Sequence, residues 1–195
     1  GLSVVDATCP YVKKVHKAAS NLVHEGYDLI IVGESGHPEV EGIVGHAEGK
    51  AHVVASPQDL DGLTLGKRVG VVVQTTQTAA NLSAVVAALA PLVSELRVVN
   101  TICAATSERQ RAAASLASEA DIMIVVGGKN SGNTRRLAQI CHAPCPKTHH
   151  IEDAAELDRS WFDGARLIGI TAGASTPQAH IERVVSAIER MTAQS

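Results

Sequence analysis

The sequence predicts an α/β fold of two tandem, pseudo-equivalent small domains, each a parallel sheet covered by helices. Short runs of valine and isoleucine alternate with alanine-rich stretches of helical spacing, a pattern typical of a parallel sheet that is buried on both faces. Much of this pattern also occurs twice along the chain. We therefore expect one α/β repeat unit over residues 1–98 and a second over residues 99–195.

The repeat is clearest where a strand-like segment leads to a cysteine. Residues 4–9 (VVDATC) correspond to residues 98–103 (VVNTIC), so that Cys9 and Cys103 lie 94 residues apart (103 minus 9). The repeat thus predicts one cysteine at the same point of each unit.

Two further pairs of apolar runs continue the repeat. The runs ending at Gly33 and Gly127 are again 94 residues apart (127 minus 33), whereas those around Val73 and Ile170 are 97 apart (170 minus 73). The change of offset predicts a small insertion, for which the Cys141–Cys145 region is a candidate. Helices are expected in the alanine-rich stretches between the runs, at residues 11–25, 79–93, 107–119, 133–141 and 177–191.

The unusual residues should gather at one edge of each sheet. In parallel α/β sheets the carboxyl ends of the strands and the amino ends of the following helices form the ligand edge, because free backbone N–H groups point there. Each unit places a cysteine after its first strand, a polar loop after the second, and hydroxyl or amide side chains after the third. If the units stack as pseudo-equivalent domains, these groups surround a common point; they lie in residues 35–39, 74–76, 129–133 and 171–175.

Composition excludes several classes of function. The net charge is -3 and aromatic residues make up 2% of the chain, so both the basic surface and the stacking residues of a nucleic-acid-binding protein are lacking. The longest apolar stretch, residues 85–93, is too short to cross a membrane and contains Pro91. Without a secretory signal, a cytoplasmic location is the expected one.

The four cysteines are interpreted as thiols rather than disulfides. One thiolate from each unit at a shared centre suits an iron-sulfur cluster, although a cluster with one open iron needs three, which points to a third repeat. The alternative is that Cys9 and Cys103 are buried and inert. Cys141 and Cys145, near His142, His149 and His150, superficially resemble a zinc site, but their spacing is loose and their surroundings are typical of a connecting loop.

Six segments resemble successive signatures of the LytB/IspH family of 4-hydroxy-3-methylbut-2-enyl diphosphate reductases. They occur in the family's order and together cover nearly all of the chain. The segments are DATCP at 6–10, GHPEVEG at 36–42, QTT at 74–76, TIC at 101–103, KNS at 129–131 with Asn133, and TAGAS at 171–175.

The resemblance implies three pseudo-symmetric α/β domains around a 4Fe-4S cluster, with this chain as the C-terminal two thirds. It implies that Cys9 and Cys103 are cluster ligands and that a third cysteine lies upstream in a Gly-Phe-Cys-Ala-Gly stretch. The only phenylalanine, Phe162, is remote from any cysteine, and the chain opens at Gly1 without methionine. We therefore expect an incomplete chain, inactive alone, whose N-terminal third is missing or is a separate segment.

The implied reaction removes the allylic hydroxyl of 4-hydroxy-3-methylbut-2-enyl diphosphate to give isopentenyl and dimethylallyl diphosphate, with ferredoxin or flavodoxin as electron donor. The resemblance assigns Glu39 to proton delivery and Thr75 to its orientation. Gly132 stands where many relatives carry serine, so one side-chain donor is expected to be replaced by backbone N–H or water. The implied substrate-binding residues are His37, Ser131, Gly132, Asn133 and Ser175.

Two other functions remain open at this point. One is another three-domain 4Fe-4S enzyme such as quinolinate synthase, which the Gly-His-Pro-Glu and Thr-Ala-Gly-Ala-Ser signatures disfavour. The other is a cluster-free anion-binding or assembly module that partners a separate N-terminal piece. Iron content distinguishes the module from either enzyme.

Overall fold

The structure is a computed structural model that describes residues 6–193, and the chain divides into two units between Cys103 and Ala104. The repeat predicted a boundary between residues 98 and 99. The units divide later because residues 99–103 follow the first sheet: the Val99 N–H donates to the Val71 carbonyl at 2.8 Å, and the Cys103 N–H donates to the Thr75 carbonyl at 3.0 Å. By these contacts Cys103 belongs to the first unit.

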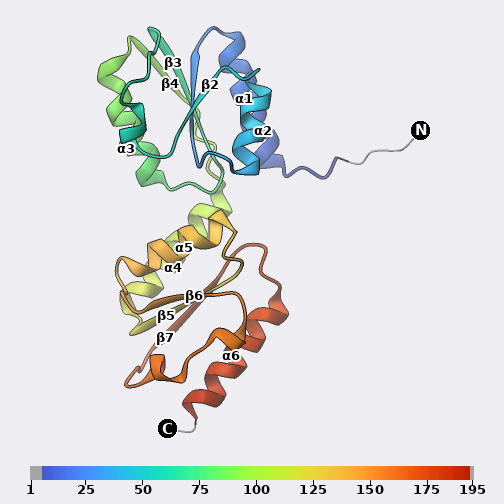
Figure 1. Ribbon diagram of the computed structural model, residues 1–195, viewed down its shortest axis with the longest axis vertical. Coiled ribbons are helices and arrows are strands. Elements are labelled where there is room, and N and C mark those ends of the chain that lie inside the picture. The colour runs from blue at the N-terminus through green and yellow to red at the C-terminus, as the bar shows by residue number, and fades with distance from the viewer. Residues whose placement is uncertain (1–5, 194–195) are drawn as a thin grey trace, which may run out of the picture. The chain divides into compact units, whose positions relative to one another are not determined.

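The first unit contains a parallel sheet with the strand order β2-β1-β3-β4. Figure 1 shows this unit with α3 on one side and α1 and α2 on the other. The two central strands are almost entirely apolar and buried, as expected of strands covered on both faces. The strands are β1 (Asp28–Val32), β2 (Ala51–Val54), β3 (Arg68–Val73) and β4 (Glu95–Val98). The helices are α1 (Pro10–His24), α2 (Pro38–His46) and α3 (Ala79–Leu89), with short 3-10 turns η1 (Pro57–Leu60) and η2 (Ala90–Leu92).

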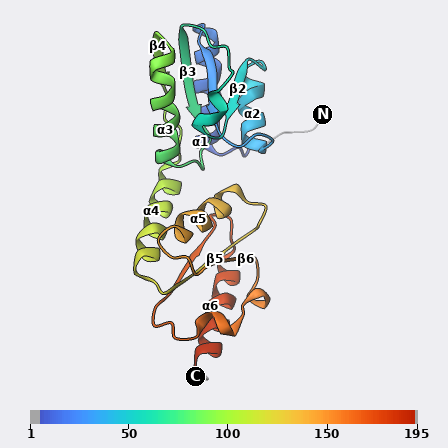
Figure 2. The same ribbon diagram turned by 60° about the vertical axis from the view of Figure 1, so that its left-hand side comes forward.

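Each face of this sheet has its own core. Alternate side chains of a strand point to opposite faces, so Leu29 and Ile31 pack with α1 and α2, whereas Ile30 and Val71 pack with α3. Figure 2 shows α3 on one side of the sheet and α1 with α2 on the other. The sheet is thus the middle layer of three.

The amino ends of the helices are fixed by local signals. Pro10 and Pro38 occupy the first turns of α1 and α2, where the missing N–H has no intrahelical partner to lose, and Thr78 caps α3 by accepting the Asn81 N–H at 3.1 Å. Because α2 and α3 each follow a parallel strand, they begin at the carboxyl edge of the sheet. That edge is where the sequence places Glu39 and Thr75.

The second unit contains a three-stranded parallel sheet with the order β6-β5-β7. Its two cores place α4 and α5 on one face and α6 on the other (Figure 1). The strands are β5 (Ile122–Val126), β6 (Thr148–Ile151) and β7 (Ile168–Ala172). The helices are α4 (Ala104–Glu119), α5 (Gly132–His142) and α6 (Gln178–Thr192), with 3-10 turns η3 (Ala154–Glu156) and η4 (Arg159–Phe162).

The predicted α/β fold with parallel sheets flanked by helices is confirmed, and the repeat can be traced strand by strand. The offset is 94 residues from β1 to β5 and 97 from β2 to β6 (148 minus 51), so three residues are inserted in between, where the Cys141–Cys145 region was expected. In the sheets Gly70 lies beside Leu29 and Gly169 beside Met123, an offset of 99 (169 minus 70). The pairing of Val73 with Ile170 was therefore wrong by two residues, which are added before β7.

Several elements were not predicted. The edge strands β2 and β6 have only four residues each, too few for a clear strand pattern. The helix α2 contains two glycines, which weaken its helical pattern. The strand-like segment at residue 98 was expected to open the second unit, but β4 pairs with β3 of the first. The corresponding segment at residues 4–5 lies outside the described residues.

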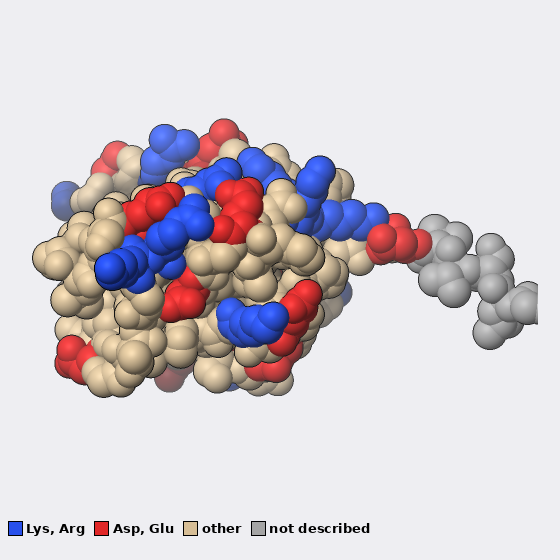
Figure 3. Space-filling model, turned by 90° about the horizontal axis from the view of Figure 1, so that it is seen from above, with Lys and Arg blue, Asp and Glu red and all other residues tan. Residues whose placement is uncertain are grey.

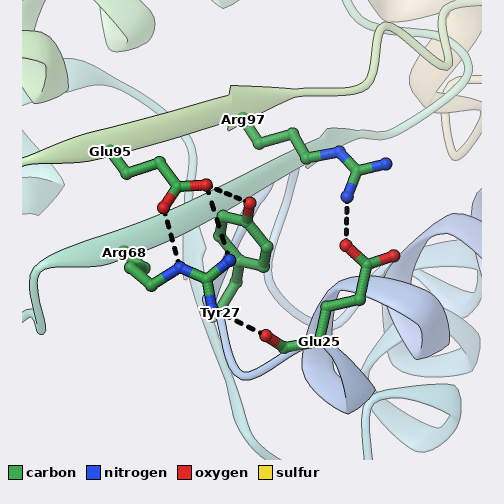
Figure 4. Close-up of polar contacts among 5 residues, drawn as sticks. All are labelled: Glu25, Tyr27, Arg68, Glu95 and Arg97. Atoms are coloured by element: carbon green, nitrogen blue, oxygen red, sulfur yellow. Dashed lines mark hydrogen bonds and ion pairs between the residues drawn. The ribbon is translucent and has the colours of Figure 1, made fainter.

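A group of polar side chains fixes β4 at the amino end of the first sheet (Figure 4). Arg68 donates to Glu95 at 2.8 Å and lies over the ring of Tyr27, with its guanidinium carbon 4.2 Å from the ring centroid. Tyr27 donates its hydroxyl proton to the same Glu95, and Arg97 pairs with Glu25 at the end of α1. These contacts join β3, β4 and α1.

Charged side chains of both signs alternate over the face of the molecule in Figure 3. Ion pairs of this kind on an exposed surface contribute little stability each and mainly fix geometry. No helix within residues 6–193 is long and apolar enough to cross a membrane.

Candidate active site

The carboxyl edge of the first sheet brings together three of the predicted site residues through hydrogen bonds. Glu39, half-buried near the start of α2, accepts the Thr75 N–H at 2.7 Å on one carboxylate oxygen and the Thr75 hydroxyl at 2.9 Å on the other. The Thr75 carbonyl in turn accepts the Cys103 N–H at 3.0 Å. Hydrogen bonds therefore connect the Glu39 carboxylate to Thr75, and Thr75 to the backbone of Cys103.

The segment after β3 that carries Thr75 is held by buried neighbours. Gln74 is 1% exposed, accepts the Glu34 N–H at 3.0 Å and donates to the Thr76 hydroxyl at 3.2 Å. A side chain at Gly33 would place its Cβ 2.8 Å from Val40 and 3.0 Å from the Gln74 amide oxygen. Only glycine fits there, so the end of β1, the start of α2 and the end of β3 pack closely.

His37 caps α2 through its ring. Its Nδ1 atom accepts the Glu39 N–H at 3.1 Å. A ring nitrogen that accepts a hydrogen bond carries no proton, so in this arrangement Nε2 holds the ring proton and is a donor. Pro38 then begins the first turn of the helix.

The cysteines expected at equivalent positions each directly precede a helix. Cys9 is exposed and stands before α1, where its carbonyl accepts the Lys13 N–H at 3.0 Å; Cys103 is half-buried and stands before α4. Thr101 guides the approach to Cys103, because its buried hydroxyl accepts the Val73 N–H at 3.0 Å and donates to the Val73 carbonyl. The sequence included Thr101 in the TIC segment at 101–103 but gave no separate signal for this contact, which depends on how the backbone after β4 packs beside β3.

The amino end of α5 forms the corresponding place in the second unit. Ser131 caps α5 by accepting the Thr134 N–H at 3.3 Å, and Gly132, the first helical residue, is buried. Asn133 comes next, and its buried amide oxygen has no hydrogen-bond partner within residues 6–193. Ser175 lies exposed in the loop after β7.

The positions in α2 and α5 correspond one to one. His37 and Ser131 are both helix caps, 94 residues apart, and Glu39 is matched by Asn133 at the same offset. At the offset of 99 set by the sheets, Thr75 is matched by Ala174, which has no hydroxyl. Glu39 accepts a hydrogen bond from the Thr75 hydroxyl, whereas the buried amide oxygen of Asn133 has no such hydroxyl beside it among the described residues.

The thiols at the end of α5 are structural. Cys141 and Cys145 are 0% and 4% exposed and pack in the core beneath α4 and α5. Burial, and then the neighbouring Cys145, raises the pKa of Cys141 to about 11, which keeps it a thiol at neutral pH.

The nearby histidines have other contacts. His149 stacks on Trp161 with ring centroids 3.7 Å apart, and burial lowers its pKa, while His150 is hydrogen-bonded through Nε2 to the Gly127 carbonyl at 2.8 Å. Across residues 6–193 no three histidine, cysteine or carboxylate side chains are grouped as metal ligands. The positions of these thiols and rings favour a structural role over the zinc site considered from sequence.

One histidine outside the predicted site is unusual. His16 on α1 stacks on His46 of α2 with centroids 4.0 Å apart, and its Nε2 is buried without a hydrogen-bond partner among the described residues. Burial, and then the neighbouring His46, lowers its pKa, whereas the charge of Glu39 acts in the opposite direction. These contacts make His16 part of the packing between α1 and α2.

Comparison with known proteins identifies the family of this chain. The family model described as LytB protein matches residues 1–189. This chain belongs to the LytB family. The match favours this family over the quinolinate synthase alternative.

Curated relatives of this LytB family member are named 4-hydroxy-3-methylbut-2-enyl diphosphate reductase. The protein from Geobacter sulfurreducens is 52% identical over 188 residues, 96% of this chain and 67% of the relative, and that from Citrifermentans bemidjiense is 50% identical, over 96% and 66%. The chain thus spans about two thirds of the length of these relatives.

Solved structures give the same result. A structure of (E)-4-hydroxy-3-methyl-but-2-enyl diphosphate reductase, described as the terminal enzyme of the non-mevalonate pathway, is 50% identical, with a TM-score of 0.60, over 97% of this chain and 69% of that one. The E-1-hydroxy-2-methyl-but-2-enyl-4-diphosphate reductase of Plasmodium falciparum is 29% identical with a TM-score of 0.89, over 95% of this chain and 59% of that one. The fold and the family of this chain are therefore shown together.

Proposed function

We propose that this chain is part of a cytoplasmic reductase that converts 4-hydroxy-3-methylbut-2-enyl diphosphate into isopentenyl and dimethylallyl diphosphate. The names of the relatives support the substrate and the reaction. The observation that carries the proposal is the hydrogen-bonded connection from Glu39 through Thr75 to Cys103 at the carboxyl edge of the first sheet. This connection joins the Glu39 carboxylate, which can carry a proton, to Cys103, whose thiol can bind a metal cofactor.

The cofactor of the proposed enzyme is a 4Fe-4S cluster. Cys9 and Cys103 fit such a group, because both are free thiols with at least part of their surface exposed, and thiolate is the ligand that these clusters use. Two thiolates are too few, so the third cysteine comes from outside this chain. When bound, the cluster supplies electrons and a Lewis-acidic iron.

Glu39 is the proposed proton donor. Replacing the allylic hydroxyl by hydrogen consumes two electrons and two protons and releases water, so a proton must reach the departing oxygen. Thr75 donates to both oxygens of the Glu39 carboxylate and thereby fixes its orientation. A general acid must lie within hydrogen-bonding reach of its acceptor, which is the geometry that this fixed orientation provides.

The diphosphate is proposed to bind at the amino ends of α2 and α5. His37 offers its Nε2 atom as a donor, because Nδ1 accepts the Glu39 N–H, and α5 begins at Ser131 and Gly132 with backbone N–H groups that favour an anion. Asn133 has amide donors, and Ser175 offers an exposed hydroxyl. These small donors bind an anion without filling the space that the substrate needs.

The test uses a full-length protein in which this chain is joined to the part of the Geobacter sulfurreducens relative that it does not match. Glu39→Gln keeps the shape of the side chain and removes the proton, so we expect the iron content and KM to persist while kcat falls by about 10²- to 10⁴-fold. Glu41→Gln, an exposed position on the same helix, is the matched control and should leave kcat unchanged. Full turnover of Glu39→Gln would make Glu39 a structural carboxylate.

The electron donor of the restored enzyme is proposed to be a reduced ferredoxin or flavodoxin. Turnover supported by one of these proteins, and absent without it, would confirm the assignment. Equal rates with and without them would exclude it.

A further inference from the structure

The loop before α5, at residues 127–131, is held differently from its counterpart at residues 33–37. In the first unit the amide oxygen of buried Gln74, at the end of β3, accepts the Glu34 N–H at 3.0 Å. At the offset of 99 set by the sheets, Gln74 is matched by Gly173, which has no side chain. The second loop therefore lacks the support that the first receives from the end of β3.

Support for the second loop comes from its other side, where β6 ends. His150 Nε2 lies 2.8 Å from the Gly127 carbonyl oxygen, and this nitrogen donates because a carbonyl oxygen only accepts. Glu152 accepts the Lys129 N–H at 2.6 Å. At the offset of 97 set by β2 and β6, the counterparts of these two residues are Val53 and Ala55, whose side chains form no hydrogen bonds.

The side chain of Lys129 adds a third contact. Its ammonium group pairs with Glu156 of η3, which also accepts the Glu152 N–H at 2.7 Å. In the first unit Asp59 makes the backbone contacts that match those of Glu156, but Ser35 stands in the place of Lys129. The ion pair raises the pKa of Lys129 and lowers that of Glu156, so both groups are charged at neutral pH. An exposed pair adds little stability, so its main effect is on the geometry of the loop.

The loop begins in an unusual backbone conformation. Gly127 has a φ of +145°, which residues with a side chain rarely adopt, and a Cβ there would lie 2.7 Å from the Thr176 hydroxyl. His150 bonds to the carbonyl of this same glycine, and four residues later Ser131 caps α5. Side chains that fix this turn therefore fix the place of the Ser131 hydroxyl and of the first N–H groups of α5.

We infer that His150 and Glu152 are positioning residues for the diphosphate of the substrate. They hold the loop in one conformation before the substrate binds, so that less conformational freedom is lost on binding. The inference rests on the proposed function, which assigns Ser131, Gly132 and Asn133 to the diphosphate. Because His150 and Glu152 act through the loop, their effect should appear in the affinity for substrate and not in the chemical step.

The charge of Glu152 makes the inference sharply testable. A carboxylate near an anion site repels the anion, so a Glu152 that contributed only its charge would weaken diphosphate binding, and its removal would strengthen binding. A Glu152 that holds the loop has the opposite effect, and its removal weakens binding. Glu152→Gln separates the two effects, because the amide oxygen still accepts the Lys129 N–H after the charge is gone.

The first measurement concerns the loop alone and uses this chain. Amide hydrogen exchange at Lys129 should become at least about 5-fold faster in Glu152→Ala and keep the unmodified rate in Glu152→Gln, because only the alanine variant loses the acceptor. The Gly127 amide, bonded to the Ile151 carbonyl at 2.9 Å, is the internal control for an intact sheet. Unchanged exchange at Lys129 in Glu152→Ala would overturn the inference.

The second measurement uses the full-length protein joined to the Geobacter sulfurreducens segment, titrated with 4-hydroxy-3-methylbut-2-enyl diphosphate in a calorimeter without reductant. Glu152→Ala should raise Kd about 5- to 10-fold, the effect of one hydrogen bond, and leave kcat within about 2-fold. Glu152→Gln should keep the unmodified Kd. Glu189→Ala, which removes the same charge from an exposed position of α6, is the control and should also keep it.

His150→Val tests the second positioning residue. It gives the second unit the residue of the first, Val53, and removes the donor to Gly127. Kd should rise at least about 3-fold, again with kcat nearly unchanged.

The outcomes separate this inference from the proposed reaction. Normal or tighter binding by Glu152→Ala or by His150→Val, beside normal turnover of the unmodified protein, would overturn this inference alone. An unmodified protein that binds the diphosphate without converting it would contradict the proposed reaction, and the shifts in Kd would still decide the roles of His150 and Glu152. An unmodified protein that does not bind the diphosphate would overturn both.

Discussion

The amino ends of α2 and α5 have the same backbone and different chemistry. Both helices come after a buried strand and begin with a side-chain cap, His37 in one and Ser131 in the other. Two residues later the first unit has a carboxylate held by Thr75, and the second has an amide, Asn133, whose oxygen lacks a partner among the described residues. The duplicated fold therefore provides two equivalent positions. One carries Glu39, the proposed proton donor, and the other carries Asn133, a proposed contact to the diphosphate.

The two sheets differ as well, because only the first carries its fourth strand within the described residues. That strand leads to Cys103. The first unit therefore contains the whole connection from cysteine to carboxylate, and the second contains none of it. If this comparison is correct, changes in the two units should affect different measurable quantities.

The largest expected effect concerns the cysteines. In the full-length protein, Cys103→Ser should prevent stoichiometric iron binding and abolish turnover, because one of the three proposed thiolate ligands is lost. Cys145→Ser, a buried thiol of the second unit, should leave the iron content per folded protein unchanged. Iron and sulfide analysis provides the measurement, and full iron content in Cys103→Ser would remove Cys103 from the ligand set.

The next largest effect comes from giving the second unit the charge of the first. Asn133→Asp places a carboxylate at the position that matches Glu39, without the hydroxyl that holds Glu39 in place. Facing an anionic substrate, it should raise KM by about 10²-fold, since like charges in contact cost several kcal/mol. Steady-state kinetics checks this, and Gln139→Glu on the exposed side of the same helix is the control for charge. A change confined to kcat would show that Asn133 takes part in the chemical step instead.

The reverse exchange should have a smaller effect. Thr75→Ala gives the first unit the residue found at Ala174 and leaves one oxygen of Glu39 without its donor. We expect kcat to fall about 10-fold, with KM nearly unchanged, because a hydrogen bond to a charged group contributes about 1.5 to 3 kcal/mol and part of it is replaced by water. If Thr75 acts through Glu39, the double variant with Glu39→Gln should be no slower than Glu39→Gln alone. Additive losses would assign Thr75 a separate role.

Much of this architecture could be predicted because the central strands carry a strong signal. Five consecutive buried residues of β5 are all apolar, and the alanine-rich helices start near prolines or cap residues. The edge strands gave no such signal: β4 alternates exposed charges such as Glu95 and Arg97 with apolar residues, so its sequence does not indicate which sheet it joins. Backbone hydrogen bonds to β3 place β4 in the first sheet. Such bonds form with any side chain, so the sequence does not reveal them.

The site was predictable to a similar degree. The polar loops at the strand ends and the family signatures pointed to Glu39 and Thr75, and the structure places them in contact. The unpartnered oxygen of Asn133 could not be foreseen from the sequence. It depends on the two extra residues before β7, which align Thr75 with Ala174, a residue that has no hydroxyl. The roles of these residues stay predictions until the full-length enzyme is assayed.

The smallest expected effect concerns the stacked histidines, His16 and His46, which the second unit lacks. His16 corresponds to Gln110 at the offset of 94 residues, so His16→Gln gives the first unit the residue of the second. Burial lowers the pKa of His16 from its ordinary value of 6.5, which means that the unfolded chain binds the proton more tightly than the folded one.

The sign of the pH dependence is set by that direction. Well above pH 6.5 the ring is neutral in both states and the folded unit is fully stable with respect to this group; as the pH falls through 6.5, the unfolded state gains a proton first and stability is lost. The carboxylates with lowered pKa, such as Glu95, act in the same direction but only below their ordinary value of 4.5. Between pH 6.5 and about 5 the histidines therefore dominate.

Thermal unfolding of the chain at pH 7.5 and at pH 5.5 measures the effect. We expect the unmodified chain to lose a few degrees of Tm on acidification, and His16→Gln to lose less, because its amide does not titrate. His149→Gln, where the pKa is also lowered by burial, should produce a comparable change in the second unit, so the double variant separates the two contributions. An equal loss of Tm in His16→Gln and the unmodified chain would show that the α1–α2 packing tolerates a charged His16, and that the unpartnered Nε2 of this ring has no influence on the stability of the first unit.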